Sequence, residues 1–329
     1  MTRGLTGFTG EVSGVEKRLQ FRVNPLRFFF RVRENIYFPE GKASNILRGA
    51  FGLIFRSIAC VPECPGVRDC GIRASCPYAR TFEPSALGEG PSGFADWPRP
   101  FVFRASRLDG RTVHAGESFD FDLHLFDMRS PAAAYFVLTF AQLGREGLGP
   151  GRGRAVLSEV WQLTEDGAPA ERLFDGESFT LREPSPLVLP LTPPPGPVGK
   201  LLVRFVSPTE LKSGQQVTSR PEFGVLAGRV RDRLSKLKDL YDDGPLPLDF
   251  RRFGERAACV RMTRCDVGRV EVMRRSSRTG GVHPIGGFVG EAEYEGELEE
   301  FVPFLRAAKW TGVGRQTVWG KGDVELSLP

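Results

Sequence analysis

Apolar and polar positions follow a recurring order along this chain. The run FDFDLHLFD at 119–127 alternates strictly between apolar and polar residues, which predicts a half-buried strand. A predicted helix over 132–143 comes next, and then the glycine-rich basic loop GREGLGPGRGR and the strand-like run AVLSEVWQL. The order is strand, helix, glycine-rich loop, strand.

The C-terminal end of the chain repeats this order. The strand GGFVGEAEYEGEL, the short helix LEEFVPFLRAA, the loop GVGRQTVWGKG and the strand DVELSL follow one another up to residue 328. Each copy is preceded by a further strand and helix: 24–34 with a helix from about Ser44, a plausible N-cap, and 200–211 with a helix over 221–241. The pattern predicts an α+β protein made of two tandem ferredoxin-like (RRM-like) domains.

Length and composition agree with two domains. The 329 residues, 40% of them apolar, suffice for about two hydrophobic cores. We expect an N-terminal domain over 1–190 with a cysteine-rich insert at about 60–80, and a C-terminal domain over 200–329. The proline-rich piece LTPPPGPVGK is the predicted linker, and a boundary nearer residue 165 is the alternative.

Hydropathy argues against a membrane protein. No apolar run reaches the roughly 18 residues of a membrane span, and the N-terminal sequence lacks the pattern of a signal peptide. We therefore expect a cytoplasmic protein.

Positive charge is concentrated in one segment. The net charge is +5, and residues 220–278 alone hold 15 Lys and Arg against 9 Asp and Glu. A basic surface such as the predicted helix face around Arg231 suggests a polyanion, most often a nucleic acid. An ordinary solvated helix face is an equally good interpretation of this charge alone.

The second glycine-rich loop combines backbone freedom with charge. Glycines let backbone amides approach a ligand closely, and the two cations would neutralise phosphate. The loop is neither a Walker loop nor a dinucleotide fingerprint, because it follows a helix and precedes a strand. Trp319 could stack on a base or anchor the loop in the core. The loop residues predicted to contact a nucleic-acid backbone are Gly312, Gly314, Arg315, Gly320, Lys321 and Gly322.

Several motifs together resemble one family. The Gly-hydrophobic-Gly, five residues, Gly-x-Gly pattern near the C-terminus is similar to the signature of the repeat-associated mysterious protein (RAMP) superfamily of CRISPR systems. The stretches NILRGAFG, CPYARTFEP, VRFVSPTELKSG, PEFGVLAGRVRDRLSKL and GGVHPIGGFVGEAEYEG extend the resemblance over roughly 24–328. The chain resembles the Cas6-type endoribonuclease, which cuts precursor CRISPR RNA within its repeats.

The resemblance implies a metal-independent reaction. The ribose 2′-hydroxyl attacks the adjacent phosphate, leaving a 2′,3′-cyclic phosphate and a 5′-hydroxyl, so CRISPR repeat RNA is the expected substrate. Many members carry a histidine near the first helix, where this chain has none. The alternative is therefore a RAMP subunit that binds crRNA in an effector complex without cutting it.

Candidate catalytic residues follow from the resemblance and from side-chain chemistry. His283 lies in a basic stretch, RRSSRTGGVHPIGG, and is either an acid, a base or RNA contact, or an exposed hairpin residue. Tyr37 and Lys42, with Arg48, occupy the region where the family keeps catalytic groups. His124 is expected to be solvated or structural, and His114 to lie in a turn. The basic hairpin residues expected to contact RNA are Arg274, Arg275 and Arg278.

Four of the six cysteines fall within one short stretch. In a reducing compartment such a group is more often a metal site than a pair of disulfides. A structural Zn²⁺ site is predicted, with an iron–sulfur cluster less favoured and four reduced thiols as the alternative. Cys259 and Cys265 are expected to be ordinary core or edge residues. A metalloprotein with a protein or DNA partner is the second rival function. The predicted metal ligands are Cys60, Cys64, Cys70 and Cys76.

Overall fold

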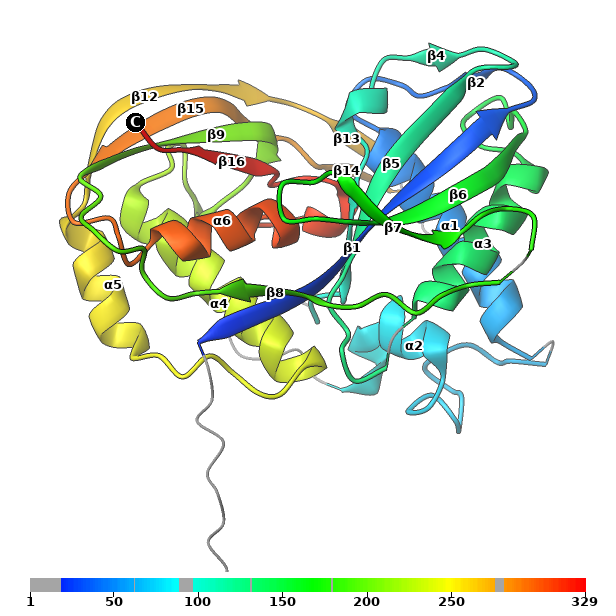
Figure 1. Cartoon of the computed structure of the whole chain (residues 1–329), viewed down its shortest axis with the longest axis horizontal. Helices are drawn as coiled ribbons and strands as arrows, with labels where there is room; N and C mark the ends of the chain where they lie inside the picture. The colour runs from blue at the N-terminus through cyan, green and yellow to red at the C-terminus, as the bar shows by residue number, and fades with distance from the viewer. Residues whose placement is uncertain (1–18, 62, 89–96, 131, 179, 276–280) are drawn as a thin grey trace, which may run out of the picture.

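The computed structural model describes residues 19–61, 63–88, 97–130, 132–178, 180–275 and 281–329. Two antiparallel sheets with helices packed against them make up the protein (Figure 1). The first half contains β1 (Gln20–Val32), β2 (Ile36–Tyr37), α1 (Ala43–Ala59), α2 (Pro77–Thr81), β3 (Phe101–Arg104), β4 (Thr112–Val113), β5 (Ser118–Leu125), α3 (Ala133–Glu146), β6 (Ala155–Leu163), β7 (Pro169–Phe174) and β8 (Leu187–Pro190).

The first sheet has the strand order β3-β5-β1-β6-β7. Helices α1 and α3 pack against each other and against this sheet, with an unusually aromatic core between them. Phe51 of α1 stacks on Phe136 of α3 with ring centroids 4.4 Å apart, and Phe28 of β1 stacks on Phe121 of β5 at 5.3 Å. Ring stacking adds to the burial of area in holding helices and sheet together.

The second half repeats this strand order. Its elements are β9 (Lys200–Thr209), β10 (Lys212–Ser213), β11 (Gln216–Val217), α4 (Phe223–Tyr241), α5 (Phe250–Cys259), β12 (Arg261–Val270), β13 (Met273–Arg275), β14 (Val282–Pro284), β15 (Gly287–Glu295), α6 (Val302–Thr311) and β16 (Val324–Ser327). The second sheet is ordered β12-β15-β9-β16, with α4 and α6 packed beneath it (Figure 1). In each half the second and third strands of a strand, helix, two strands, helix, strand unit lie to one side of the first strand and the fourth to the other, which is the ferredoxin-like arrangement.

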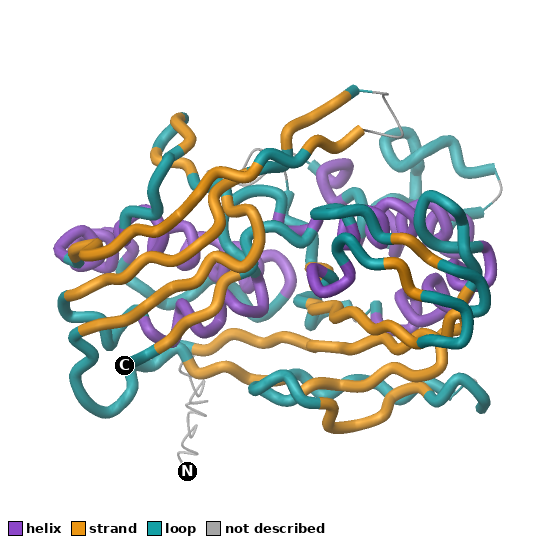
Figure 2. Tube along the Cα trace, turned by 90° about the horizontal axis from the view of Figure 1, so that it is seen from above, coloured by secondary structure: helices purple, strands orange, loops and turns teal. Residues whose placement is uncertain are grey.

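Strand β1 passes from one half to the other (Figures 1 and 2). Its first four residues pair with β8, whereas the rest pair with β5 and β6 of the first sheet. Phe21 and Val23 at its start pack into the same hydrophobic cluster as α4 and α6. A single long strand therefore contributes to both hydrophobic cores.

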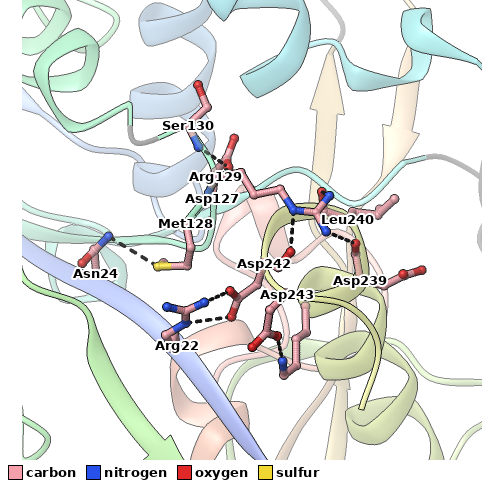
Figure 3. Close-up of polar contacts among 11 residues, drawn as sticks. Arg22, Asn24, Asp127, Met128, Arg129, Ser130, Asp239, Leu240, Asp242 and Asp243 are labelled. Atoms are coloured by element: carbon pink, nitrogen blue, oxygen red, sulfur yellow. Dashed lines mark hydrogen bonds and ion pairs between the residues drawn. The ribbon is translucent and has the colours of Figure 1, made fainter. Parts of the chain in front are cut away.

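Polar contacts also fix the end of α4 to the first half (Figure 3). Arg129, in the loop before α3, donates to the carbonyl oxygens of Asp239, Leu240 and Asp242, the first two 3.1 and 3.2 Å away. Arg22 of β1 forms an ion pair with the Asp242 carboxylate. The bonds from Arg129 satisfy carbonyl groups that the last turn of a helix leaves unpaired.

The element order expected from the sequence is confirmed for the main strands and helices. Ser44 is not the N-cap of α1, because the helix begins at Ala43 with Lys42 as its cap. Helix α5 was not predicted; it places Cys259 at an exposed helix end rather than in the core or at a sheet edge, while the half-buried Cys265 lies on β12. His124 is buried and therefore structural rather than solvated.

Candidate nucleic-acid interface

The first turn of α1 lies where several of the predicted site residues meet. Tyr37 ends the short strand β2 with 47% of its surface exposed, and Lys42 follows as the helix cap. The Lys42 side chain supplies no acceptor for the first amides of the helix. Asp109 supplies one from a distant loop, with its carboxylate accepting from the Ala43 N–H at 2.8 Å. A remote carboxylate thus caps the helix and stabilises its positive end.

Lys321 joins the second glycine-rich loop to this helix entrance. Its side chain is buried and the ammonium donates to the Gly41 carbonyl oxygen at 3.0 Å. Burial lowers the pKa of Lys321, and the nearby Asp109 carboxylate partly offsets this effect. Burial likewise raises the pKa of Asp109. Lys321 is therefore a buried residue that links the loop to the entrance of α1.

The glycines of this loop are required by its packing. Gly312, Gly314, Gly320 and Gly322 all have positive φ, between 68° and 80°. A β-carbon on Gly322 would overlap the carbonyl oxygen of Val313, and one on Gly320 would overlap the Ser44 side chain of α1. Only glycine combines these backbone angles with such close contacts.

Most amides of the loop already have acceptors within the protein. The N–H groups of Gly312, Gly320 and Gly322 donate to the carbonyl oxygens of Ala308, Thr317 and Pro208. Glycine amides held in this way are not directed at a ligand. The loop resembles the first glycine-rich loop, where β-carbons on Gly149 and Gly153 would overlap the backbone of β2 and the residue before it. The two loops are similar in packing as well as in sequence.

The loop has one side chain that is half exposed, Arg315, and one that packs against the protein core, Trp319. Arg315 is half exposed and forms an ion pair with Glu210. Trp319 packs against the first hydrophobic core, and the Arg48 guanidinium lies 5.4 Å from its ring and 4.6 Å from that of Phe82. Trp319 thus anchors the loop, and Arg48 is a buried cation between two rings rather than a surface charge.

The β13–β14 hairpin lies against the same region. His283 is paired with Arg274 in the hairpin register, and Arg275 with Val282. At the base of the hairpin, Gln316 of the glycine-rich loop donates to the Pro284 carbonyl oxygen at 3.1 Å. The Val272 side chain lies 3.4 Å from the position a β-carbon would take on Gly41. Arg278 lies outside the described residues. The hairpin, the glycine-rich loop and the entrance of α1 therefore adjoin one another.

Arg231 lies apart from this region, on α4. Its guanidinium donates to Asp232 and to the Phe250 carbonyl oxygen, and it stacks over the Phe250 ring at 4.5 Å. Only 13% of its side chain is exposed. These contacts hold α5 against α4, so Arg231 lies in the contact between these two helices.

Beneath the glycine-rich loop, the end of α6 is surrounded by buried basic side chains. His124 Nδ1 donates to the Trp310 carbonyl oxygen at 2.8 Å and Arg104 donates to that of Lys309 at 3.2 Å. Arg233 of α4 donates to the Thr311 carbonyl oxygen at 2.8 Å. Burial, with the Arg104 charge, lowers the pKa of Arg233 to about 9. The carbonyl end of the helix dipole stabilises the two arginine cations.

The four cysteines of the insert are free thiols, each of them half-buried. Burial raises the pKa of Cys60 to about 11, whereas the Gly66 amide lowers that of Cys64. Within the described part of the chain, no three His, Cys, Asp or Glu side chains stand ready to hold a metal ion.

Asp109 was the functional residue that sequence analysis missed. It lies 66 positions from the helix that it caps, in a turn without a recognisable motif, so only the tertiary structure connects the two. For the residues that the structure describes, no helix has the length and apolar character needed to cross a membrane.

Family comparisons divide the chain into two parts. Residues 21–186 match the family AF_1859_N, described as an N-terminal domain. Residues 203–324 match the family CRISPR-associated endoribonuclease Cas6. No curated protein sequence matches the chain.

Similar structures include Cas6 (TTHB231) in a product complex, which is 18% identical with a TM-score of 0.54, over 93% of this chain and 99% of that one. The Cas6 (TTHB231) of Thermus thermophilus is 16% identical, with a TM-score of 0.52 over 93% of this chain and 98% of the other. A chain of a partial Cas6-RT-Cas1–Cas2 complex is 12% identical, with a TM-score of 0.53 over 95% of this chain and 47% of that chain. At these identities the likeness is one of fold.

Proposed function

The chain belongs to the AF_1859_N family through residues 21–186 and is a Cas6-type CRISPR-associated protein, and from this premise we propose that it cleaves CRISPR repeat RNA. The observation that carries the proposal is the meeting of three segments at one place. These are the glycine-rich loop, the entrance of α1 and the β13–β14 hairpin, joined by Lys321 and Gln316. A Cas6-family match over 203–324 includes two of the three segments.

The proposed reaction needs no metal ion. The 2′-oxygen of the ribose bonds to the adjacent phosphorus while its proton passes to a basic group. The bond from phosphorus to the 5′-oxygen breaks, and that oxygen takes a proton from an acidic group. The products are a 2′,3′-cyclic phosphate and a 5′-hydroxyl, and cations stabilise the developing phosphorane charge.

His283, Tyr37 and Lys42 are the proposed catalytic residues. Tyr37 is exposed on β2, Lys42 begins α1, and the hairpin that carries His283 lies against the residue before Lys42. In this proposal Lys42 stabilises phosphorane charge, and His283 or the Tyr37 hydroxyl transfers a proton. Arg48, held between two rings, would contribute charge without touching substrate.

RNA would bind mainly through cations around the glycine-rich loop. Arg315 is the exposed cation of the loop, and Arg274 and Arg275 belong to the adjoining hairpin. Since the amides of Gly312, Gly320 and Gly322 are already used, these glycines would shape the loop rather than contact phosphate themselves. Lys321 and Arg231 would contribute indirectly, through their buried and interhelical contacts.

We further propose the organisation expected from the sequence: tandem ferredoxin-like domains over 1–190 and 200–329 in a cytoplasmic protein. The repeated strand order supports this division. Any zinc ion bound by the cysteine insert would have a structural role and not a catalytic one. Contact with CRISPR effector subunits is proposed as the resemblance implies, and contact with other CRISPR proteins by analogy with the similar chain found in a Cas6-RT-Cas1–Cas2 complex.

Cleavage is tested by incubating the protein in EDTA with repeat RNA from its own genome and with the same RNA carrying a 2′-deoxy at the mapped cut. We expect cleavage of the first RNA only. His283→Ala, Tyr37→Phe and Lys42→Ala should slow it, and Arg251→Ala, on the exposed face of α5, should not. Tight binding without any cut would instead make the protein a crRNA-holding subunit.

A further inference from the structure

A groove opens at the edge of the first sheet, where β6 and β7 lie side by side (Figure 1). It encloses about 950 Å³ between these strands and the chain segment that follows β7, which is within the size range of ligand pockets. None of its lining residues belongs to the glycine-rich loop, the entrance of α1 or the β13–β14 hairpin. The polar and aromatic residues that line it include Trp161, Glu171, Arg172, Asp175 and Arg182.

The walls of the groove are fixed by packing. Leu173 of β7 is buried in the first hydrophobic core. A β-carbon on Gly176 would lie 2.5 Å from the Ser158 carbonyl oxygen, so the segment after β7 lies directly against β6. Further along this segment, the Arg182 N–H donates to the Leu173 carbonyl oxygen at 3.0 Å. The groove is therefore built into the folded sheet.

Trp161 gives the groove an aromatic surface. Leu157 and Val160 of β6 point into the first core, whereas Trp161 lies half-buried on the opposite face of the sheet. Its indole N–H donates to the Glu159 carboxylate at 2.9 Å, and the Arg172 guanidinium lies 5.9 Å from the centre of the ring. The hydrogen bond fixes the orientation of the ring, so the surface is ready for a planar group to stack on it.

Charged side chains surround this aromatic surface in pairs. Arg172 lies 3.3 Å from Glu159, and Arg182 lies 3.6 Å from Glu171. The two arginine side chains are 51% and 71% exposed, and ion pairs between such exposed groups are weak, so a guanidinium can exchange its partner for a phosphate. Aromatic rings stack on bases, guanidiniums bind phosphates, and carboxylates accept from ribose hydroxyls. The groove combines all three kinds of group.

The groove adjoins the proposed RNA interface through α6. The Lys309 ammonium, in the last turn of that helix, donates to the Glu165 carbonyl oxygen in the turn between β6 and β7 at 3.2 Å. Trp161 precedes Glu165 by four residues, which span at most about 14 Å. The glycine-rich loop begins directly after α6, at Gly312. An RNA strand bound at that loop can therefore reach the groove.

We infer that this groove binds one unpaired nucleotide of the RNA. The base stacks on Trp161, the phosphate binds Arg172 and Arg182, and the ribose 2′-hydroxyl donates to the Glu171 carboxylate. The inference rests on the proposed RNA-binding function and adds a contact outside the proposed cleavage site. A peptide pairing with the edge strand β7 fits less well, because the Leu173 carbonyl oxygen on that edge already accepts from Arg182.

The experiment compares binding of an unstructured decaadenylate RNA and of the DNA of the same sequence to the full-length protein. Trp161→Ala should weaken RNA binding at least about fivefold, through the loss of one stacked base. Trp161→Phe should keep most of the affinity but remove the quenching of tryptophan fluorescence that a stacked base causes. This second variant separates stacking from a merely structural role of the indole.

The charged residues have their own readouts. Arg172→Ala and Arg182→Ala should each weaken binding and reduce the slope of log K against log salt by up to about 0.7. Glu171→Ala should narrow the preference for RNA over DNA, because it removes the acceptor for the 2′-hydroxyl. Arg251→Ala is the matched control, an exposed arginine paired with Glu255 on α5, and should change neither the affinity nor the slope.

Wild-type affinity for RNA in Trp161→Ala would overturn the inference, and so would equal binding of the RNA and DNA oligomers by the unmutated protein. A groove that takes a peptide instead would give the first of these results. Either result leaves cleavage of repeat RNA untouched, so the proposed function would still stand. A protein that binds neither the oligomer nor uncleavable repeat RNA would contradict both. If Trp161→Ala fails to fold, the fluorescence of Trp161→Phe and the salt slopes of the arginine variants decide.

Discussion

His124 makes the stability of the fold depend on pH. Its imidazole is fully buried and its pKa is lowered to about 4, chiefly by burial and then by the Arg104 charge. In the unfolded chain a histidine takes up a proton below about pH 6.5. The unfolded state therefore binds more protons between these values. Stability should be complete above pH 6.5 and fall by about 3 kcal/mol as the pH approaches 4.

Urea unfolding of the wild type and of His124→Gln at several pH values tests this expectation. Glutamine keeps a donor for the Trp310 carbonyl oxygen but has no titrating group. The stability difference between the two proteins should therefore shrink by up to ~1.4 kcal/mol for each pH unit of acidification in this window. His114→Gln, at an exposed turn, is the control. Parallel pH curves for wild type and His124→Gln would contradict the explanation.

Gly322 should be intolerant of any side chain. Alanine there would be held at φ 68° with its β-carbon overlapping the Val313 carbonyl oxygen. The two effects together should cost about 2–5 kcal/mol of unfolding free energy. Gly49→Ala is the matched control, because nothing lies within 4 Å of its β-carbon and it is inside α1. Alanine at 49 should stabilise by up to about 1 kcal/mol, and chemical denaturation measures both.

Arg104 connects the halves of the protein through a largely buried ion pair. Arg104 of β3 lies 3.3 Å from the Asp323 carboxylate just before β16 and also donates to α6. Arg104→Met should cost about 3–5 kcal/mol, because the partly buried Asp323 carboxylate is left without its cation. Adding Asp323→Asn should restore much of that loss.

A double-mutant cycle in urea measures this coupling. The Arg204–Glu325 pair, on the exposed face of the second sheet with a separation of 3.7 Å, is the control. Arg204→Met should cost no more than about 1 kcal/mol. Additive effects of the Arg104 and Asp323 substitutions would contradict a role for the buried pair.

Sequence patterns predicted the helices and strands better than they predicted the contacts between distant parts of the chain. The alternation in β5 and the apolar stripe of α4 are local, so they identify these elements directly. Helix α5 was missed because only Phe253 and Ala257 of its ten residues are buried, which leaves little apolar pattern. The cap of α1 was misplaced because its acceptor, Asp109, comes from another part of the chain.

The candidate site was predicted only in outline for a similar reason. Glycines and cations of the loop at 312–322 are visible in the sequence, but their burial is not. Lys321 and Arg315 look alike as cations, yet one is buried at 4% exposure and the other has half of its side chain exposed. Which of them can contact a ligand depends on packing between the halves of the protein.

At the scale of the whole molecule, many basic residues are already engaged by partners within the protein. On the second sheet, the exposed Arg264 and Lys200 are paired with Glu291 and Glu293. The cations of α4 are similarly engaged, including Arg231. The excess of positive charge over 220–278 is therefore a poor guide to where RNA binds, although it attracts RNA at long range.

The contrast between Arg315 and Arg231 tests where RNA binds. With repeat RNA made uncleavable by a 2′-deoxy at the cut, the affinity is measured at several salt concentrations. Each lost phosphate contact should reduce the slope of log K against log salt by about 0.7 for single-stranded RNA. Arg315→Ala should do this and weaken binding, whereas Glu210→Gln, which frees Arg315 from its ion pair, should strengthen it.

Arg231→Met should instead lower Tm and leave the slope unchanged, because its guanidinium joins α4 to α5. If Arg231→Met reduces the slope and Arg315→Ala does not, RNA follows the face of α4 and the glycine-rich loop is only a structural connection between the halves. If both reduce it, the RNA path extends from the loop across the helix. A slope that Arg315→Ala reduces and Arg231→Met leaves unchanged is the one result consistent with an RNA backbone held at the entrance of α1.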